Sequence, residues 1–180
     1  MFKLIIRLTF IASLVAGMYY GSPYYTLYQA RSALVARDSA TFNTFVDYKR
    51  VQASVKNQLT AKLNETLKGN TAGQQIGTKV IESLVKTAIT PQRMPQILLK
   101  GDFSNLDGVL PTAAAVELGR TNQEPLSWDV KFGTNTVVVN IYRASEGARD
   151  TAQEIAFVFE RLAPLSLEWT MSEIKLPLEF

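Results

Sequence analysis

The hydrophobic pattern of this chain changes its period near residue 126, and that change limits the folds that the chain can adopt. Before residue 126, apolar residues recur every three or four positions, as they do on one face of a helix. After it, as in the segment LSWDVKF at 126–132, apolar and polar residues alternate, which is typical of a strand with one buried face. A run of helices followed by a run of strands favours an α+β domain over a parallel α/β fold.

The second part of the chain, residues 126–178, is predicted to form a four-stranded antiparallel sheet. Gly133-Thr134-Asn135 can make a hairpin turn between the first strand and a return strand at 136–143. A longer loop at 144–152 follows, and alternation then resumes for two further strands.

The two last predicted strands lie at 155–159 and from residue 165 onward. Alternation runs to Met171 and then continues one position out of phase, so we expect a β-bulge near Ser172-Glu173. The helices would cover the apolar face of the sheet. Much of the shared core would then come from five aromatic residues: Trp128, Phe132, Phe157, Phe159 and Trp169.

The helical part, residues 22–100, begins with a helix-start signal. Ser22-Pro23 places a serine at an N-cap and a proline at the first helical position, which predicts a helix to about Ala36. Two later helices, at 39–46 and about 48–68, each follow an aspartate.

Those aspartates, Asp38 and Asp47, have two interpretations. As paired carboxylates they would serve acid–base chemistry, and as N-caps each would stabilise its helix by about 1 kcal/mol. Their positions favour the caps.

The segment GNTAGQQIGT at 69–78 is predicted to be a flexible connection. It has the glycine content of a phosphate-binding loop but neither the G-x-x-x-x-G-K-[ST] nor the G-x-G-x-x-G spacing. A helix at about 78–89 and a short one from Thr90-Pro91 to Lys100 complete the helical part.

Residues 1–21 are predicted to anchor the chain in a membrane. Lys3 and Arg7 precede an uncharged run from Leu8 to Gly21, and about 20 residues are needed to cross the hydrocarbon. A cleaved signal peptide is the alternative, but no site has small residues at both required positions. The positive-inside rule keeps the basic end in the cytoplasm. We therefore expect a bacterial inner-membrane protein with one span and a single soluble domain, residues 22–180, facing the periplasm.

The chain contains no cysteine and no histidine, and this absence excludes several classes of function. A Ser-His-Asp triad, a Cys-His pair and a zinc or haem site with histidine ligands cannot be built. We expect no cofactor, no metal and no enzymatic activity. Carboxylate or tyrosine chemistry stays open as a minor alternative.

Charge is distributed unevenly along the chain. Residues 1–100 carry 13 lysines and arginines against 4 acidic residues, and residues 101–180 carry 6 against 12. A basic half suits anionic lipid or an acidic partner, but the two halves can also neutralise each other within one domain, which we favour. The basic residues of the helix at 48–68 do not share a face, so nucleic-acid binding is not expected.

The apolar face of the sheet is the candidate binding site. If helices and sheet leave it unfilled, an apolar ligand would lie among Trp128, Phe157, Phe159 and Trp169; the alternative is a packed core. Arginine binds carboxylate and phosphate well, and three arginines are candidates for a pocket mouth: Arg31, Arg143 and Arg161.

Residues 22–59 carry the pattern S-P-Y, A-x-x-x-x-D, V-D-Y, S-V-K and Q-L. This segment resembles a bacterial family of N-terminally membrane-anchored domains of unknown function. Thr90-Pro91 and the closing stretch from Trp169 to Pro177 are also similar to it. The resemblance implies location and fold, and no chemistry. The matching positions in the segment are Ser22, Pro23, Tyr24, Tyr28, Arg31, Ala33, Asp38, Val46, Asp47, Tyr48, Ser54, Lys56, Gln58 and Leu59.

The order of helices and sheet is also similar to cone-shaped domains of the cystatin and nuclear-transport-factor-2 type, which host many functions. We expect a non-enzymatic module that binds another envelope protein. The alternative is a module that binds a small apolar or anionic ligand, lipid included, in a cavity between helices and sheet.

Overall fold

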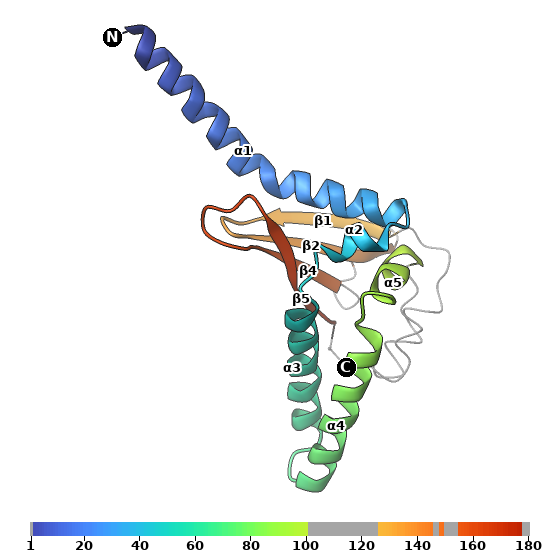
Figure 1. The fold of residues 1–180 in the computed structure, drawn as a ribbon. Helices are drawn as coiled ribbons and strands as arrows, with labels where there is room; N and C mark the ends of the chain where they lie inside the picture. The colour runs from blue at the N-terminus through green and yellow to red at the C-terminus, as the bar shows by residue number, and fades with distance from the viewer. Residues whose placement is uncertain (1, 101–125, 146–147, 150–154, 178–180) are drawn as a thin grey trace.

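The computed structural model describes residues 2–100, 126–145, 148–149 and 155–177 (Figure 1). A helical part precedes a sheet, which confirms the α+β class. The helices are α1 (Phe2–Val35), α2 (Ser39–Asn43), α3 (Tyr48–Thr66), α4 (Thr71–Ala88) and α5 (Met94–Lys100). The strands are β1 (Leu126–Phe132), β2 (Thr136–Ser145), β3 (Ala148–Arg149), β4 (Ile155–Arg161) and β5 (Trp169–Lys175).

Four of the strands form the antiparallel meander that the sequence predicts, in the order β1-β2-β4-β5, and the short β3 pairs with β2. The predicted bulge is confirmed, because Val158 pairs with Glu173 and Phe159 with Met171, which leaves Ser172 as the extra residue. The expected start of the last strand at Leu165 is wrong. β5 begins at Trp169, and Leu165 lies in the connecting loop.

One face of the sheet is apolar across all four strands. In the ladder Val130 lies opposite Val139, Val139 opposite Phe157, and Phe157 opposite Ile174. The part of α1 that follows Gly21 runs along the sheet, and α3 meets it at β5 (Figure 1). The buried core therefore lies between this face and the helices.

The expectation that Trp128 and Phe132 belong to the core is wrong. Their side chains are 55% and 41% exposed. β1 is at the edge of the meander with β2 as its neighbour, so the cover that buries β4 does not extend over it. Phe157, Phe159 and Trp169 are buried as predicted.

The predicted helix start at Ser22-Pro23 is also wrong, because α1 runs through both residues. A proline inside a helix removes the hydrogen bond to the carbonyl four residues earlier, which here belongs to Tyr19. That carbonyl is satisfied by the Ser22 hydroxyl, which donates at 2.9 Å, and by the Arg161 guanidinium at 3.5 Å. These substitutes let the helix continue, and it changes direction in this region (Figure 1).

The first part of α1 projects from the domain. Side chains from Lys3 to Met18 are exposed, and the helix is long and apolar enough to cross a membrane. α3 and α4 extend from the other side of the sheet, away from this projection (Figure 1).

Both predicted caps are confirmed. The Asp38 carboxylate accepts a hydrogen bond from the Thr41 N–H, and the Asp47 carboxylate accepts one from the Arg50 N–H. These contacts agree with helix starts set by side-chain acceptors rather than with a pair of carboxylates held together.

The flexible connection expected at 69–78 is wrong beyond its first two residues. α4 starts at Thr71, with the Asn70 side chain accepting from the Gly73 N–H. Gly77 lies against α3 so closely that an added Cβ would be 2.6 Å from Leu63 Cδ2. Helix packing here explains a glycine that composition alone assigns to a loop.

Candidate functional site

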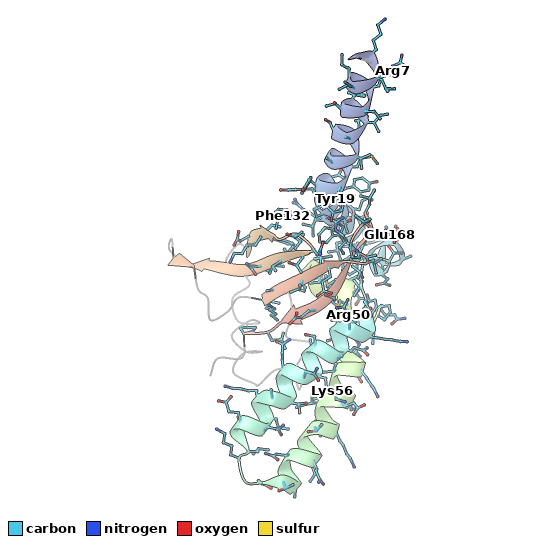
Figure 2. All side chains as sticks on the ribbon, turned by 90° about the vertical axis from the view of Figure 1, so that its left-hand side faces the viewer. Arg7, Tyr19, Arg50, Lys56, Phe132 and Glu168 are labelled. Atoms are coloured by element: carbon cyan, nitrogen blue, oxygen red, sulfur yellow. The ribbon has the colours of Figure 1, made fainter. Side chains whose placement is uncertain are left out.

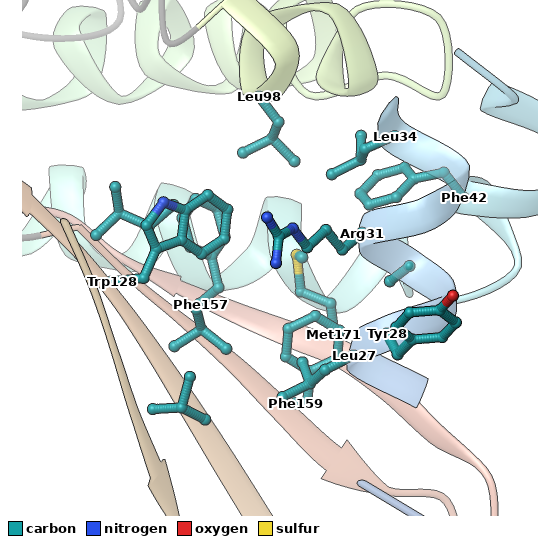
Figure 3. Close-up of a pocket in the computed structure, with 14 residues that line it drawn as sticks. Leu27, Tyr28, Arg31, Leu34, Phe42, Leu98, Trp128, Phe157, Phe159 and Met171 are labelled. Atoms are coloured by element: carbon teal, nitrogen blue, oxygen red, sulfur yellow. The ribbon is translucent and has the colours of Figure 1, made fainter. Parts of the chain in front are cut away.

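A cavity of about 560 Å³ lies between the second part of α1 and the apolar face of the sheet (Figure 3). The cavity is lined by side chains of α1, α2 and α5 and by apolar side chains of β1, β2, β4 and β5. They are Leu27, Tyr28, Ala30, Arg31, Leu34, Phe42, Leu98, Trp128, Val130, Val139, Ile141, Phe157, Phe159 and Met171.

The sheet forms one wall of the cavity, and the residues of this wall differ in burial. Phe157 and Phe159 of β4 are buried and held by strands on both sides. Trp128 and Val130 of β1 are partly exposed. The cavity therefore has a rigid floor and one side formed by an edge strand.

The opposite wall is one face of α1. Leu27, Ala30 and Leu34 recur at helical spacing and turn toward the sheet. Ala30 is buried, and its single methyl group leaves space that a larger residue would occupy. Phe42 of α2 and Leu98 of α5 extend this wall (Figure 3).

Arg31 is the one charged residue among the described residues of the lining. Its guanidinium points into the space between Trp128 and Leu98 (Figure 3). Within the residues that the structure describes, no hydrogen bond or ion pair of this group is found. An arginine beside apolar walls, with no carboxylate among the described lining residues, favours a ligand that carries a carboxylate or phosphate.

The structure brings four of the predicted site residues together: Arg31, Trp128, Phe157 and Phe159 all line the cavity. Trp169 does not line it; its indole N–H donates to the Ser22 hydroxyl at 2.9 Å. Arg143 pairs with Leu126 through the β1–β2 ladder, and its side chain lies outside what the structure describes.

Arg161, the third candidate arginine, does not reach the cavity either. Its guanidinium lies 3.9 Å from the centre of the Tyr19 ring and 4.4 Å from that of Trp169. It also donates to the carbonyl of Ser166. Arg161 thus joins α1 to the end of β4 rather than presenting a free charge.

Apart from Arg31, sequence reasoning missed the lining residues that come from helices. Leu27 and Leu34 share a helical face that the sequence does indicate, but no pattern shows which strand this face would meet. Phe42, Leu98 and Met171 reach the cavity through tertiary packing alone.

The described residues hold no group of three or more acidic side chains placed to bind a metal ion. Among the titratable groups that the structure describes, three have pKa values that depart from the ordinary range. Burial raises the pKa of Tyr48 to about 12, hydrogen bonding from Thr41 lowers the pKa of Asp38, and hydrogen bonding from Lys86 and Lys56 lowers the pKa of Glu82. None of these three groups lines the cavity.

Lysine and arginine side chains of α3 and α4 lie away from the cavity. Arg50 of α3 pairs with Glu160 of β4 at 2.5 Å, which joins the basic and acidic parts of the chain. Lys56 and Lys86 both reach Glu82. Of these contacts, Arg50–Glu160 agrees with the interpretation that the two halves neutralise each other, whereas the Glu82 pairs lie within the basic half.

Comparison with known proteins yields one match. No curated protein and no solved structure matches the chain significantly, so the likeness to cone-shaped domains stays a prediction. A family model covers most of α1 and ends in α5, before the sheet begins. This match confirms the resemblance to a family without known function. Residues 12–97 match the family described as Protein of unknown function (DUF2939).

Proposed function

We propose that this chain is a membrane-tethered module that binds a small apolar molecule bearing an anionic group. The observation that carries the proposal is the cavity of about 560 Å³ with apolar walls and Arg31 directed into it. Its volume lies within the usual range of small-molecule sites, roughly 300 to 1,000 Å³.

Each part of the ligand has a matching wall. An acyl chain or other apolar body would lie against Phe157, Phe159 and Trp128, with removal of its surface from water as the driving force. A carboxylate or phosphate would accept hydrogen bonds from the Arg31 guanidinium. Fatty acids and the acyl parts of lipids share this chemistry.

The proposed location is the bacterial inner membrane, with the domain facing the periplasm. The uncharged run from Leu8 to Gly21 and the exposed surface of the first part of α1 support a single span. Lys3 and Arg7 support a cytoplasmic N-terminus by the positive-inside rule.

The test is a fluorescence titration of the full chain in phosphatidylcholine nanodiscs, which avoids detergent in the cavity. The chain has two tryptophans; Trp128 lines the cavity and Trp169 does not. Dodecanoate should change the emission of the wild-type protein to saturation. The variant Trp128→Phe keeps Trp169 and should show only the signal of general partitioning into lipid.

The anionic group is tested by Arg31→Gln with dodecanoate and dodecanol side by side. Loss of a charged hydrogen bond of about 1.5 to 3 kcal/mol predicts roughly tenfold to hundredfold weaker dodecanoate binding. Dodecanol binding should change little. A wild-type titration that never saturates, or equal dodecanoate affinity in Arg31→Gln, contradicts the proposal.

A second candidate function is binding of another envelope protein. The observation that favours it is β1, whose outer edge pairs with no strand among the described residues. Trp128 and Phe132 are exposed on this strand, and the Phe132 ring stacks on Tyr24 with centroids 4.1 Å apart. An open edge and aromatic side chains are typical of strand-addition sites.

Photo-crosslinking in membranes tests this candidate. A photoreactive phenylalanine analogue in place of Phe132 should trap one defined envelope protein, and the same analogue in place of the exposed Val80 on α4 should not. Equal crosslinking at both positions would mean that β1 has no dedicated partner.

A further inference from the structure

The loop that joins β4 to β5, residues 162–168 with the sequence LAPLSLE, exposes three leucines within six positions. Leu162, Leu165 and Leu167 are 60%, 87% and 43% exposed. We call this segment the leucine loop. Exposed leucines gathered at one place mark a surface that is covered by something other than water.

The leucine loop is held in shape by its own hydrogen bonds, so its exposed leucines are a built feature. The Leu162 N–H donates to the Glu168 carbonyl at 3.1 Å, and the Ser166 N–H donates to the Ala163 carbonyl at 2.9 Å. The first of these bonds closes the base of the loop. It places the charged Glu168 at the base and Leu165 at the tip.

The loop is also fixed to α1 at one level of the helix. The Tyr19 hydroxyl donates to the Pro164 carbonyl at 2.9 Å. Trp169, which follows the loop, donates to Ser22, and Arg161, which precedes it, packs on the Tyr19 ring. Both ends and the middle of the leucine loop therefore contact residues 19–22.

That level is the end of the apolar span. The helical stretch from Phe2 to Tyr20 covers about 29 Å at 1.5 Å per residue, which is close to the thickness of the hydrocarbon core. Tyrosines are enriched where such a span meets the headgroups. A carbonyl within hydrogen-bond reach of Tyr19 lies at nearly the same depth, and so does the leucine loop.

Figure 2 shows the same arrangement from the side. Tyr19, Phe132 and Glu168 lie at the base of the projecting helix, Arg7 lies near its far end, and Lys56 lies on the opposite side of the sheet. Between α1 and the loop is a groove of about 760 Å³, which starts at Met18 and is bordered by Leu162 and Leu167. Since Met18 belongs to the apolar span, this groove is open toward lipid.

We infer that the leucine loop inserts into the membrane–water interface beside α1, as a second membrane contact of the domain. The inference rests on the proposed anchoring of α1 and adds an orientation to it. A single span leaves a domain free to rotate and tilt, whereas a second contact holds the sheet at one angle to the bilayer. The partner is the lipid surface itself.

The first experiment measures depth with labels on the full chain in phosphatidylcholine–phosphatidylglycerol liposomes. The chain has no cysteine, so each single-cysteine variant carries one environment-sensitive fluorophore. The labelled positions are Leu165→Cys in the loop, Leu8→Cys in the span and Gln75→Cys on α4, an exposed control. Lipids with a spin label near the headgroup should quench the Leu165→Cys label several-fold more than the Gln75→Cys label.

The three labels distinguish failure of the leucine-loop inference from failure of the proposed membrane anchor. Strong quenching at Leu8→Cys with a Leu165→Cys label as weakly quenched as Gln75→Cys would overturn the leucine-loop inference and leave the anchor in place. Weak quenching at all three positions would overturn both.

The second experiment asks whether the leucine side chain drives insertion. The label is moved to Ala163→Cys, and Leu165 is changed to Asp or, as the matched control, to Ile. Because Leu165 is almost fully exposed, neither change should disturb the fold. Leu165→Asp should lower lipid quenching several-fold and Leu165→Ile should preserve it. Equal quenching in both variants would overturn the inference.

Discussion

β1 and β4 both carry large apolar residues at every second position, yet these residues differ in burial. The intervening residues are polar in β1, whereas in β4 they are Ala156 and Val158. Residues 155–159 of β4 are all buried, whereas Trp128, Val130 and Phe132 of β1 remain substantially exposed. The alternation tells which side chains share a face, and both strands do contribute to one apolar face. Burial depends on the position of a strand in the sheet, and only β4 has a strand on each side.

This difference in burial suggests separate roles for the two strands: the β4 part of the apolar face mainly stabilises the fold, and the β1 part mainly serves ligand binding. Phe157 and Phe159 of β4 line the cavity too, but they are buried members of the core and hold the fold together. Trp128 and Val130 of β1 line the cavity from a partly exposed position. Substitutions on β4 should therefore act on folding first, and substitutions on β1 should act mainly on ligand binding.

The largest effect expected from this division is that of Phe157→Ala. Removing a buried ring costs about 3 to 5 kcal/mol, because the transfer free energy is lost and a void remains. Trp128→Ala removes a larger side chain but one more than half exposed, so we expect a loss under about 1.5 kcal/mol. Urea unfolding of both variants in nanodiscs, followed by circular dichroism, measures the difference.

Dodecanoate binding is then compared between Trp128→Ala and Phe157→Ala, at temperatures where both variants are folded. Since Trp128→Ala lacks the reporter, its binding is measured by calorimetry. Trp128→Ala should weaken binding although it is stable. If Trp128→Ala unfolds as easily as Phe157→Ala, β1 belongs to the packed core and the division fails.

A matched pair of valines sharpens the comparison with a smaller effect. Val137 of β2 is buried between Phe132 and Phe159 in the ladder, and Val130 of β1 faces the cavity. Val137→Phe overpacks a filled site and should cost about 1 to 3 kcal/mol. Val130→Phe should change the free energy of unfolding by about 0.5 kcal/mol or less and weaken dodecanoate binding, because the added ring occupies cavity space. Equal destabilisation by the two changes would show that no usable space lies in front of β1.

Sequence patterns predicted the strands well because alternation and turn residues are local signals. The turn at Gly133-Thr134-Asn135, the bulge near Ser172 and both aspartate caps follow from neighbours within a few positions. The exposure of Trp128 could not be predicted in this way, since it depends on which strand occupies the edge.

The helix errors have the same physical origin. Ser22-Pro23 is typical of a helix start. The Ser22 hydroxyl supplies one local donor to the freed Tyr19 carbonyl, and the other contacts that accommodate the continuing helix come from Arg161 and Trp169, at least 139 positions away. Gly77 is typical of a loop by composition, and the close approach of Leu63 from α3 explains a small residue at this position inside α4. In the candidate site, the aromatic floor and Arg31 were predictable, but the helical wall was not, because its pairing with the sheet is a tertiary contact.

The smallest expected effect concerns Tyr48 and tests whether the packed core extends from β4 past β5 to the start of α3. Tyr48 starts α3, which meets β5, and its hydroxyl donates to Asn43 from a partly buried position. Burial raises the pKa of Tyr48 to about 12 from the usual 10, so the folded state keeps the proton that the unfolded state loses. This contribution to stability is complete below pH 10 and is lost as pH rises from 10 to 12.

In Tyr48→Phe the slope of the free energy of unfolding against pH should therefore be shallower between pH 10 and 12 than in the wild-type protein. Urea unfolding at several pH values measures this slope. An unchanged slope would mean that water reaches Tyr48 and that the first residue of α3 lies outside the packed core, which would then begin at Val51 on this helix.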